Sequence, residues 1–234
     1  MATVTEPSAS LRHRLDLRAG ILVVIALILV GGSAGSLGGP AFAVVAAAAG
    51  LVWGSILTVI AAMLGRSERR RRTWATGVLS VSVVVAGLLA GSGFMGQLLF
   101  DTTLADAPDV FASLVRGSVG NAESTPFYLF NTPLEWLLVP TELLLCWRVI
   151  RQRRLLLPAA VVFYISRVWT YLYFVPQIFD WSGSTTPLTA GQLEQAQTWV
   201  DLSWIRLAID ITIMILLLAA LLSTGQRRER DDVA

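Results

Sequence analysis

Long apolar stretches alternate with short polar segments along the whole chain, and this alternation predicts a helical membrane protein. A helix of about 20 apolar residues is long enough to cross the hydrocarbon core of a bilayer. Six stretches meet this requirement or come close to it. We predict membrane spans at about residues 19–36, 40–64, 74–100, 132–148, 155–179 and 199–222. The predicted fold class is therefore an all-α membrane protein with six transmembrane helices.

The overall composition agrees with this pattern. Hydrophobic residues make up 55% of the 234 residues, and the mean hydropathy is +0.66. Soluble domains are usually about 45–50% apolar. Six spans use a large part of the chain, and the rest leaves no room for a second globular domain. The sequence thus predicts one membrane domain, with the lipid bilayer as a partner.

Arginines set the predicted orientation, because they gather on one side of the predicted spans. Fifteen of the eighteen lie in four clusters, and a pair of spans separates each cluster from the next: Arg12, Arg14 and Arg18; Arg66 and Arg69 to Arg72; Arg148, Arg151, Arg153 and Arg154; Arg227, Arg228 and Arg230. Cytoplasmic loops of membrane proteins carry such an excess of positive residues. We therefore predict that both termini are cytoplasmic. The chain has arginine but no lysine, and it is rich in alanine and glycine, which points to a bacterial inner membrane.

The predicted spans divide the chain into four parts. Residues 1–18 form a cytoplasmic tail, 19–72 an N-terminal two-span hairpin, 73–224 a four-span functional unit, and 225–234 a second cytoplasmic tail. The four-span unit carries two acidic outer loops, at 101–132 and 180–198. The first span also has the basic start, short apolar core and small residues of a cleaved signal peptide, and this alternative stays open.

Small residues repeat every fourth position in two of the spans. Ala46, Gly50 and Gly54 form one such series, and Gly87 and Gly91 form another. Small residues at this spacing let two helix backbones approach closely in a membrane. Both series predict packing between helices of this chain.

Ionisable residues inside the spans are the strongest functional signal. Such a residue costs about 2.5–3.5 kcal/mol at the middle of a membrane helix, and it is retained where it pairs or works. Glu135 and Glu142 lie on span four, Arg167 on span five, and Arg206 and Asp210 on span six. Seven residues separate the two glutamates, so an α-helix would place them on one face. We expect Glu142, Arg167 and Asp210 to face one another, with Glu135 and Arg206 nearer the outer surface.

Polar and aromatic side chains share the predicted faces of these charges. They predict a pocket between spans three to six that opens outward. The candidate catalytic residues are Glu142, Asp210, Arg167 and Arg206. The candidate substrate-binding residues are Glu135, Tyr164, Tyr171, Gln177, Trp199, Ser203 and Gln97. In the alternative interpretation the charges only hold helices together, as the buried ion pairs Arg167 with Glu142 and Arg206 with Asp210.

The sequence also limits the chemistry. Cys146 is the single cysteine and His13 the single histidine, so cysteine-based zinc and iron–sulfur sites, histidine-rich di-iron sites and bis-histidine haem sites are excluded. A metal could be held only by carboxylates and amides, which suits hard cations. We predict no metal site and no cofactor. The net charge of +2 is polarised between the two sides of the predicted membrane, which argues for topology and against nucleic-acid binding.

Residues of about 85–224 resemble the anthrone-oxygenase-like family of small membrane proteins, most of whose bacterial members have no assigned function. The motifs are Ala86-Gly87-Leu88-Leu89-Ala90-Gly91 in span three, Thr170 with Val175-Pro176-Gln177 in span five, and Trp199-x-x-x-Ser203-x-x-Arg206 entering span six. The family commonly carries asparagine where Gln177 and Ser203 stand, and the N-terminal pair of spans is extra. The resemblance implies oxidation of a polycyclic phenol to a quinone without a cofactor, with Trp199, Arg206 and Gln177 as matching site positions.

Three functions stay open at this point. In an oxygenase, Glu142 or Asp210 would be the base, and Arg167 and Arg206 would stabilise the developing oxyanion. In a membrane cyclase the same carboxyl groups would donate a proton, and the tyrosines would steady cationic intermediates. In a non-enzymatic protein the pocket would bind a partner or serve assembly. The predicted partner of an enzyme is a lipophilic small molecule, and the sequence does not determine the oligomeric state.

Overall fold

The computed structural model describes residues 9–118, 125–183 and 187–232, and all regular structure in these ranges is helical. The elements are α1 (Ala9–Gly35), η1 (Ser36–Gly38), α2 (Pro40–Leu64), α3 (Glu68–Asp106), α4 (Pro108–Ser118), α5 (Thr125–Pro133), η2 (Leu134–Leu138), α6 (Val139–Cys146), α7 (Ile150–Trp169), η3 (Thr170–Phe174), α8 (Val175–Ser182) and α9 (Ala190–Asp232). Here η1 is a 3-10 turn, whereas η2 and η3 are π-helical segments. The predicted all-α fold is confirmed for the described residues.

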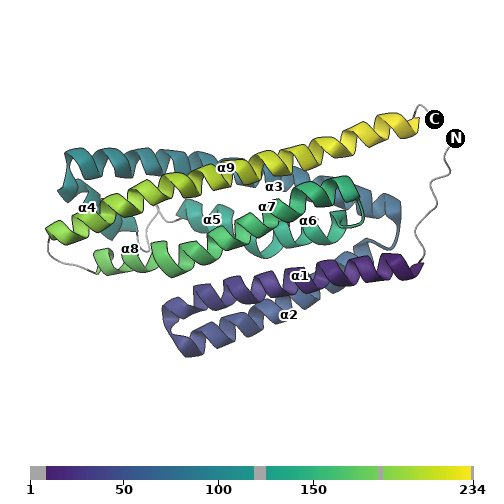
Figure 1. The fold of residues 1–234 in the computed structure, drawn as a ribbon, viewed down its shortest axis with the longest axis horizontal. Coiled ribbons are helices and arrows are strands. Elements are labelled where there is room, and N and C mark those ends of the chain that lie inside the picture. Colours follow the sequence, from purple (N-terminus) through teal and green to yellow (C-terminus); the bar gives the residue numbers. More distant parts are fainter. Residues whose placement is uncertain (1–8, 119–124, 184–186, 233–234) are drawn as a thin grey trace.

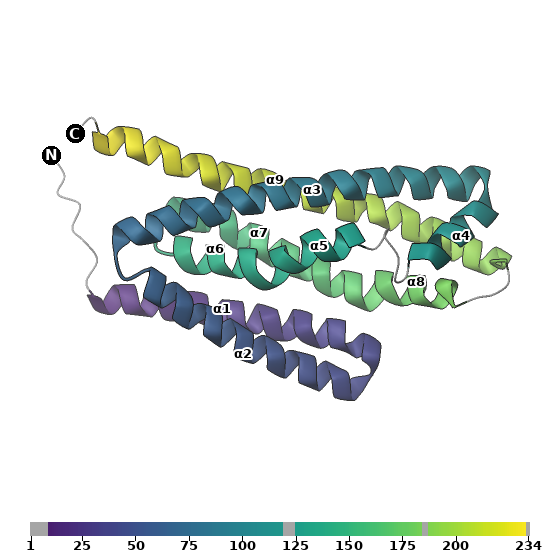
Figure 2. The ribbon, with the colours of Figure 1, turned by 180° about the vertical axis from the view of Figure 1, so that it is seen from behind.

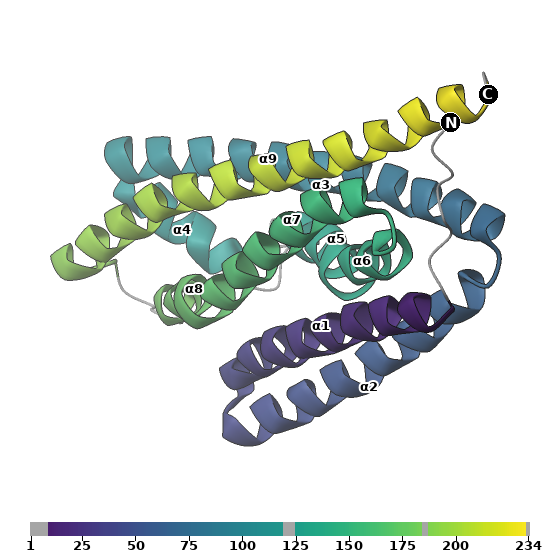
Figure 3. The same ribbon diagram turned by 45° about the vertical axis from the view of Figure 1, so that its right-hand side comes forward.

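The helices form a long bundle with a hairpin attached to one side (Figure 1). The two longest helices, α3 and α9, lie side by side. The run α5–η2–α6 and the run α7–η3–α8 lie next to them. The hairpin of α1 and α2 packs against α6, and α1 also contacts α7 (Figure 3). The α6 segment therefore lies between the hairpin and α3, which agrees with the burial of every residue from Val139 to Cys146 except Thr141.

Five helices are long and apolar enough to cross a membrane: Asp16–Gly38, Pro40–Leu64, Glu68–Asp106, Ile150–Ser182 and Ala190–Thr224. They coincide with five of the six predicted spans. The predicted span at 132–148 is not among them. It belongs to the run α5–η2–α6, which is helical from Thr125 to Cys146 but is interrupted by a π-helical segment. The count of six spans and the orientation stay predictions.

Several helices continue beyond the apolar stretches that define the predicted spans. The tail at 1–18 is helical from Ala9 onward, and the outer loops contain the end of α3, all of α4 and the start of α9. The 39 residues of α3 and the 43 residues of α9 correspond to about 58 Å and 64 Å, about twice the thickness of a hydrocarbon core. Both helices are therefore longer than a crossing of the hydrocarbon core requires.

The end of the bundle that contains α4 and α8 has a core of its own. Phe111 and Val115 of the amphipathic helix α4 are buried against Trp181 of α8 and Trp199 of α9. The ring centroids of Trp181 and Trp199 lie 6.2 Å apart at a steep angle, which is a favourable aromatic geometry. This aromatic core holds the end of α3, helix α8 and the first part of α9 together. A second and larger core lies along the bundle and includes the faces of α1 and α2 that contact it.

Glycines bring the two helices of the hairpin together. A Cβ atom at Gly50 would collide with the carbonyl group of Leu27, and one at Gly54 would lie 3.0 Å from the Cα atom of Val24. The predicted close approach in this span is therefore confirmed. The second series is different, because a Cβ atom at Gly87 would reach only Met214, at 3.6 Å, and one at Gly91 would meet nothing within 4 Å. The prediction of close packing at Gly91 is wrong.

Among the described residues, two polar contacts connect the hairpin to the rest of the molecule. The indole nitrogen of Trp53 on α2 donates to the carbonyl oxygen of Trp136, at 2.7 Å. Near the start of α1, the carboxylate of Asp16 accepts two hydrogen bonds from the guanidinium group of Arg148, one of them at 2.8 Å. These bonds raise the pKa of Arg148 above its ordinary value. The hairpin is therefore attached at two levels.

Candidate functional site

Two prolines shape the centre of the bundle. Pro140 and Pro176 each lie two residues after a π-helical segment, η2 and η3 respectively. Proline has no N–H group to donate to the preceding turn of a helix. In η2 the N–H group of Val139 donates instead to the carbonyl oxygen of Leu134, five residues earlier. Such π-helical turns are rare and occur frequently at functional sites.

The missing donor of Pro140 leaves two carbonyl groups for side chains to bind. In an α-helix its nitrogen would face the carbonyl oxygen of Trp136, and in a π-helix that of Glu135. Tyr164 on α7 donates its hydroxyl to the Glu135 carbonyl oxygen at 2.8 Å, while Trp53 donates to that of Trp136. The helix defect is thereby satisfied by residues from two neighbouring helices, as buried backbone groups require.

Glu135 points from η2 into the bundle and is completely buried, with 0% of its surface exposed. The hydroxyl of Tyr171, on η3, lies 3.1 Å and 3.3 Å from its two carboxylate oxygens. Arg167 lies on the same side of the bundle, since it binds Asn131, which lies four residues before Glu135. No ion pair within 4 Å involves Glu135 in the described ranges, so Arg167 does not bond to it directly.

Arg167 is the centre of a buried polar network on α7. Its guanidinium group donates to the carboxylate of Asp210 at 2.7 Å and to the side-chain oxygen of Asn131 at 2.9 Å. The ring of Phe163 lies 5.1 Å below the guanidinium carbon. Only 1% of the Arg167 side chain is exposed, against 14% for Asp210. We call Asn131, Glu135, Arg167, Tyr171 and Asp210 the Arg167 cluster.

Arg206 is held by aromatic rings. Its guanidinium carbon lies 4.5 Å from the ring centre of Phe174 and 5.9 Å from that of Trp199. The indole nitrogen of Trp199 donates to the carbonyl oxygen of Phe174 at 3.2 Å, which fixes the ring under the cation. Contacts of this kind stabilise a cation in a site with little water. No ion pair within 4 Å joins Arg206 to Asp210 in the described part of the chain, and Asp210 binds Arg167 instead.

The other predicted binding residues have different environments. Gln97 on α3 is buried and donates to the carbonyl oxygen of Val200 on α9 at 2.7 Å, so it connects the two long helices. Ser203 is buried, and its hydroxyl has no hydrogen-bond partner among the described residues. Gln177 is half-buried on α8. The structure brings Glu135, Tyr171, Arg167 and Asp210 together and leaves Gln97 in a packing position.

The expected contact of Glu142 with Arg167 is wrong. Glu142 is buried on α6 beside Ser82 and Cys146, and its Oε1 atom has no hydrogen-bond partner in the part of the chain that the structure describes. The cause is η2. A π-helical turn takes up about one more residue than an α-helical turn, so seven residues no longer complete two turns. Glu135 and Glu142 therefore do not share a face, and only Glu135 lies near Arg167.

Asn131, which binds Arg167, was not among the predicted site residues. Asn131 lies four residues before Glu135, so the two would share a helix face. This spacing was a usable signal, but the predicted span began one residue later, at 132. No comparable pattern marks Ser82, whose hydroxyl donates to the carbonyl oxygen of Val78 within its own helix.

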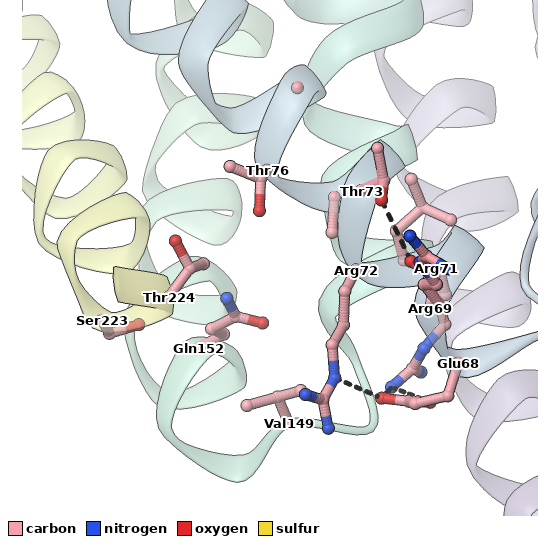
Figure 4. A pocket seen from close by; sticks show the side chains of 13 residues that line it. Glu68, Arg69, Arg71, Arg72, Thr73, Thr76, Val149, Gln152, Ser223 and Thr224 are labelled. Carbon is pink, nitrogen blue, oxygen red and sulfur yellow. Dashed lines mark hydrogen bonds and ion pairs between the residues drawn. The ribbon is translucent and has the colours of Figure 1, made fainter. Parts of the chain in front are cut away.

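A cavity of about 840 Å³ lies away from the Arg167 cluster, at the end of the bundle where α3 starts. It is enclosed by the start of α3, the start of α7 and the end of α9 (Figure 4). Its polar lining includes Glu68, Arg69, Arg71, Arg72, Thr73, Thr76, Gln152, Ser223 and Thr224. From the sequence, these arginines were predicted only to set the topology. The outward-open pocket predicted around the Arg167 cluster stays a prediction.

The Arg167 cluster combines a carboxylate with a phenol and an anchored cation. Glu135 can accept a proton, and Tyr171 and Arg167 can stabilise negative charge next to it. In the described ranges, no group of three histidine, cysteine, aspartate or glutamate side chains is placed to hold a metal ion. Comparisons with protein families, with curated proteins and with solved structures found no match to this chain.

Proposed function

We propose that this chain is a six-span protein of a bacterial inner membrane whose Arg167 cluster oxidises a lipophilic polycyclic phenol without a cofactor. The proposal combines the geometry of the cluster with the resemblance of residues 85–224 to the anthrone-oxygenase-like family. In this proposal the base is Glu135, in place of Glu142 or Asp210.

The arginine-bearing segments support the proposed topology. The start of α1, the α2–α3 turn, the α6–α7 turn and the end of α9 all lie at one end of the bundle (Figures 1 and 2). The positive-inside rule puts this end in the cytoplasm. The helical run from Thr125 to Cys146 has a length of about 33 Å, enough for a sixth span. Reporter fusions at Ala105 and Gln192 should be external, and fusions at Ser67 and Gln152 internal.

The observation that carries the proposed chemistry is the difference between the two carboxylates near Arg167. Asp210 forms the direct ion pair and neutralises the cation. Glu135 lies in the same cluster without an ion pair of its own within 4 Å, and a phenolic hydroxyl touches both of its oxygens. A buried carboxylate without a direct counter-ion is a better proton acceptor than one bound to arginine. Glu135 therefore suits the role of general base.

The reaction requires a proton transfer and oxygen as the oxidant. Glu135 removes a proton from the activated ring carbon of the phenol, and the resulting carbanion delocalises its charge onto the phenolic oxygen, towards Arg167 and Tyr171. Two electrons pass from this carbanion to O₂ as a carbon–oxygen bond forms. The proton returns to the peroxide and gives a hydroperoxide on this carbon. Glu135 then removes the second hydrogen of the same carbon as a proton, the oxygen–oxygen bond breaks as the carbon becomes a carbonyl group, and the hydroxide that leaves takes up this proton as water. Proton transfer from a positioned base contributes about 10²–10⁴-fold to such a rate.

The test measures oxygen uptake by the purified protein with a panel of tricyclic anthrones. Replacement of Glu135 by Gln removes the base but keeps the shape and the hydrogen bond from Tyr171. We expect the rate to fall at least about 100-fold, with a small change in melting temperature. Glu142→Gln is the matched control, because it changes a second buried carboxylate of the same helical run that lies away from Arg167. It should keep nearly the full rate.

Two outcomes would contradict the proposed oxygenase activity. One is a wild-type protein that consumes no oxygen with any member of the panel. The other is a Glu135→Gln variant that loses thermal stability but keeps its rate, which would mean that the cluster only holds helices together.

A further inference from the structure

We propose that the cavity at the arginine-bearing end binds the phosphate group of an anionic phospholipid from the cytoplasmic leaflet. This inference does not depend on the chemistry of the Arg167 cluster. It takes from the proposed topology only that this end of the bundle lies at the cytoplasmic surface. We call the cavity the inner groove.

The strongest evidence is Arg71. Only 5% of this residue is exposed, and it lines the inner groove from the first turn of α3. Its Nη2 atom lies 3.3 Å from the carboxylate of Glu68. Its Nε and Nη1 atoms have no hydrogen-bond partner among the described residues. Three N–H donors of a buried cation therefore lack an acceptor, although buried polar groups nearly always have one.

The charge of the groove favours an anion. Arg69 and Arg72 line the same wall, and Glu68 is the one acidic residue among the described residues of the lining (Figure 4). The half-exposed Glu68 also binds Arg72, at 3.3 Å. The wall lies at the N-terminal end of α3, where the backbone dipole favours negative charge. Phosphate suits such a site, because arginine donates several directed hydrogen bonds to its oxygens.

The rest of the lining favours a lipid over a free phosphate ion. Ala75, Leu145 and Val149 contribute apolar surface next to the arginines. Across the groove lie Gln152 and the hydroxyl groups of Ser223 and Thr224 (Figure 4). A phospholipid has both parts that this surface matches, a charged phosphate and an acyl chain. Basic pockets between helices on the cytoplasmic side of a membrane recognise anionic headgroups in this way.

Native mass spectrometry of the full chain in mild detergent tests the proposal. Phosphatidylglycerol, phosphatidylcholine and inorganic phosphate are titrated separately. We expect phosphatidylglycerol to bind at least about tenfold more tightly than phosphatidylcholine. Arg71→Gln should weaken the binding of phosphatidylglycerol at least about tenfold. Arg70→Gln is the matched control, because Arg70 is exposed on the same turn and does not line the groove. It should change the affinity less than about twofold.

A second variant separates binding from folding. Gly77 lines the groove, and a Cβ atom there would meet nothing within 4 Å. Gly77→Leu should therefore fill the groove without a clash and keep every charge. We expect this variant to bind phosphatidylglycerol at least about tenfold more weakly, with an unchanged melting temperature.

Three results would overturn the proposal. Equal weakening by Arg70→Gln and Arg71→Gln would show unspecific attraction to a basic surface. Full binding by Gly77→Leu would place the lipid elsewhere. Inorganic phosphate that binds at millimolar concentration and displaces the lipid would identify the ligand as the free ion.

Discussion

The N-terminal hairpin and the bundle of α3 to α9 hold their helices together by different means. In the hairpin, backbone lies against backbone, since Gly50 leaves no space for a Cβ atom beside Leu27. In the bundle, a Cβ atom at Gly91 would meet open space, and buried polar side chains make the connections between helices. Arg167 with Asp210 connects α7 to α9, and Gln97 connects α3 to α9.

This difference shows why the hairpin can serve packing while the bundle can hold functional groups. Small residues allow close helix contact and gain dispersion energy, but they leave no volume for functional groups. Helices that are connected through long side chains stand further apart and can enclose carboxylates, phenols and guanidinium groups. The hairpin carries no charged residue between Ala19 and Leu64, whereas the bundle encloses the Arg167 cluster. The hairpin is therefore a support, and the bundle holds the candidate site.

The largest expected effect follows from breaking the polar connection in the bundle. Arg167→Leu leaves Asp210 without its cation and Asn131 without its donor. Removal of one partner from a buried ion pair costs about 3–5 kcal/mol. We expect a corresponding loss of unfolding free energy, measured by denaturant titration in detergent.

The double variant Arg167→Leu with Asp210→Leu sharpens this test. Replacement of a whole buried pair by apolar residues is often neutral, so the double variant should lose less stability than Arg167→Leu alone. A double variant that is at least as unstable as the single one would show that the pair does not behave as a buried ion pair.

A smaller loss is expected from the hairpin. Gly50→Leu forces α1 and α2 apart, because its side chain would occupy the position of the Leu27 carbonyl group. Overpacking of this kind costs about 1–3 kcal/mol. The matched control is Gly91→Leu, which enters open space and should change the unfolding free energy by less than about 0.5 kcal/mol. Similar losses at the two glycines would remove the distinction between the regions.

Hydrophobic pattern alone predicted most of the fold. The bounds of α2 agree with the predicted span at 40–64 because Pro40 starts the helix and the polar segment after Leu64 ends it. The ends of α3 and α9 were not predictable from hydropathy. The end of α3 and the start of α9 extend into polar sequence because this region buries Phe111 of α4 and Trp199 of α9 in one aromatic core. An average over hydropathy does not register such contacts.

The sequence predicted the residue types of the candidate site, but not all of the contacts between them. Depth estimates from the spans correctly brought Arg167 and Asp210 together. They failed for Glu142 because the seven-residue spacing from Glu135 assumes a regular α-helix. Pro140 lies between the two glutamates and was visible in the sequence. A proline inside a helical pattern indicates a distortion but not the π-helical form that it takes here, since that form depends on donors from Tyr164 and Trp53.

The smallest expected effect concerns the contact that joins the two regions at their arginine-bearing end. Asp16 and Arg148 are partly exposed, with 34% and 25% of their side chains accessible, so solvent screens their attraction. An exposed ion pair contributes about 0.2–1 kcal/mol. Asp16→Asn should lower the unfolding free energy by about 0.5 kcal/mol at low salt and by less at 0.5 M salt, where charges more than a few ångströms apart are screened. The measurement is a double-mutant cycle with Arg148→Gln at both salt concentrations. If the pair joins the hairpin to the bundle, the two single losses are not additive, and the coupling energy decreases as salt increases. Additive losses at low salt would mean that Trp53 and the apolar contacts of α6 attach the hairpin without help from this ion pair.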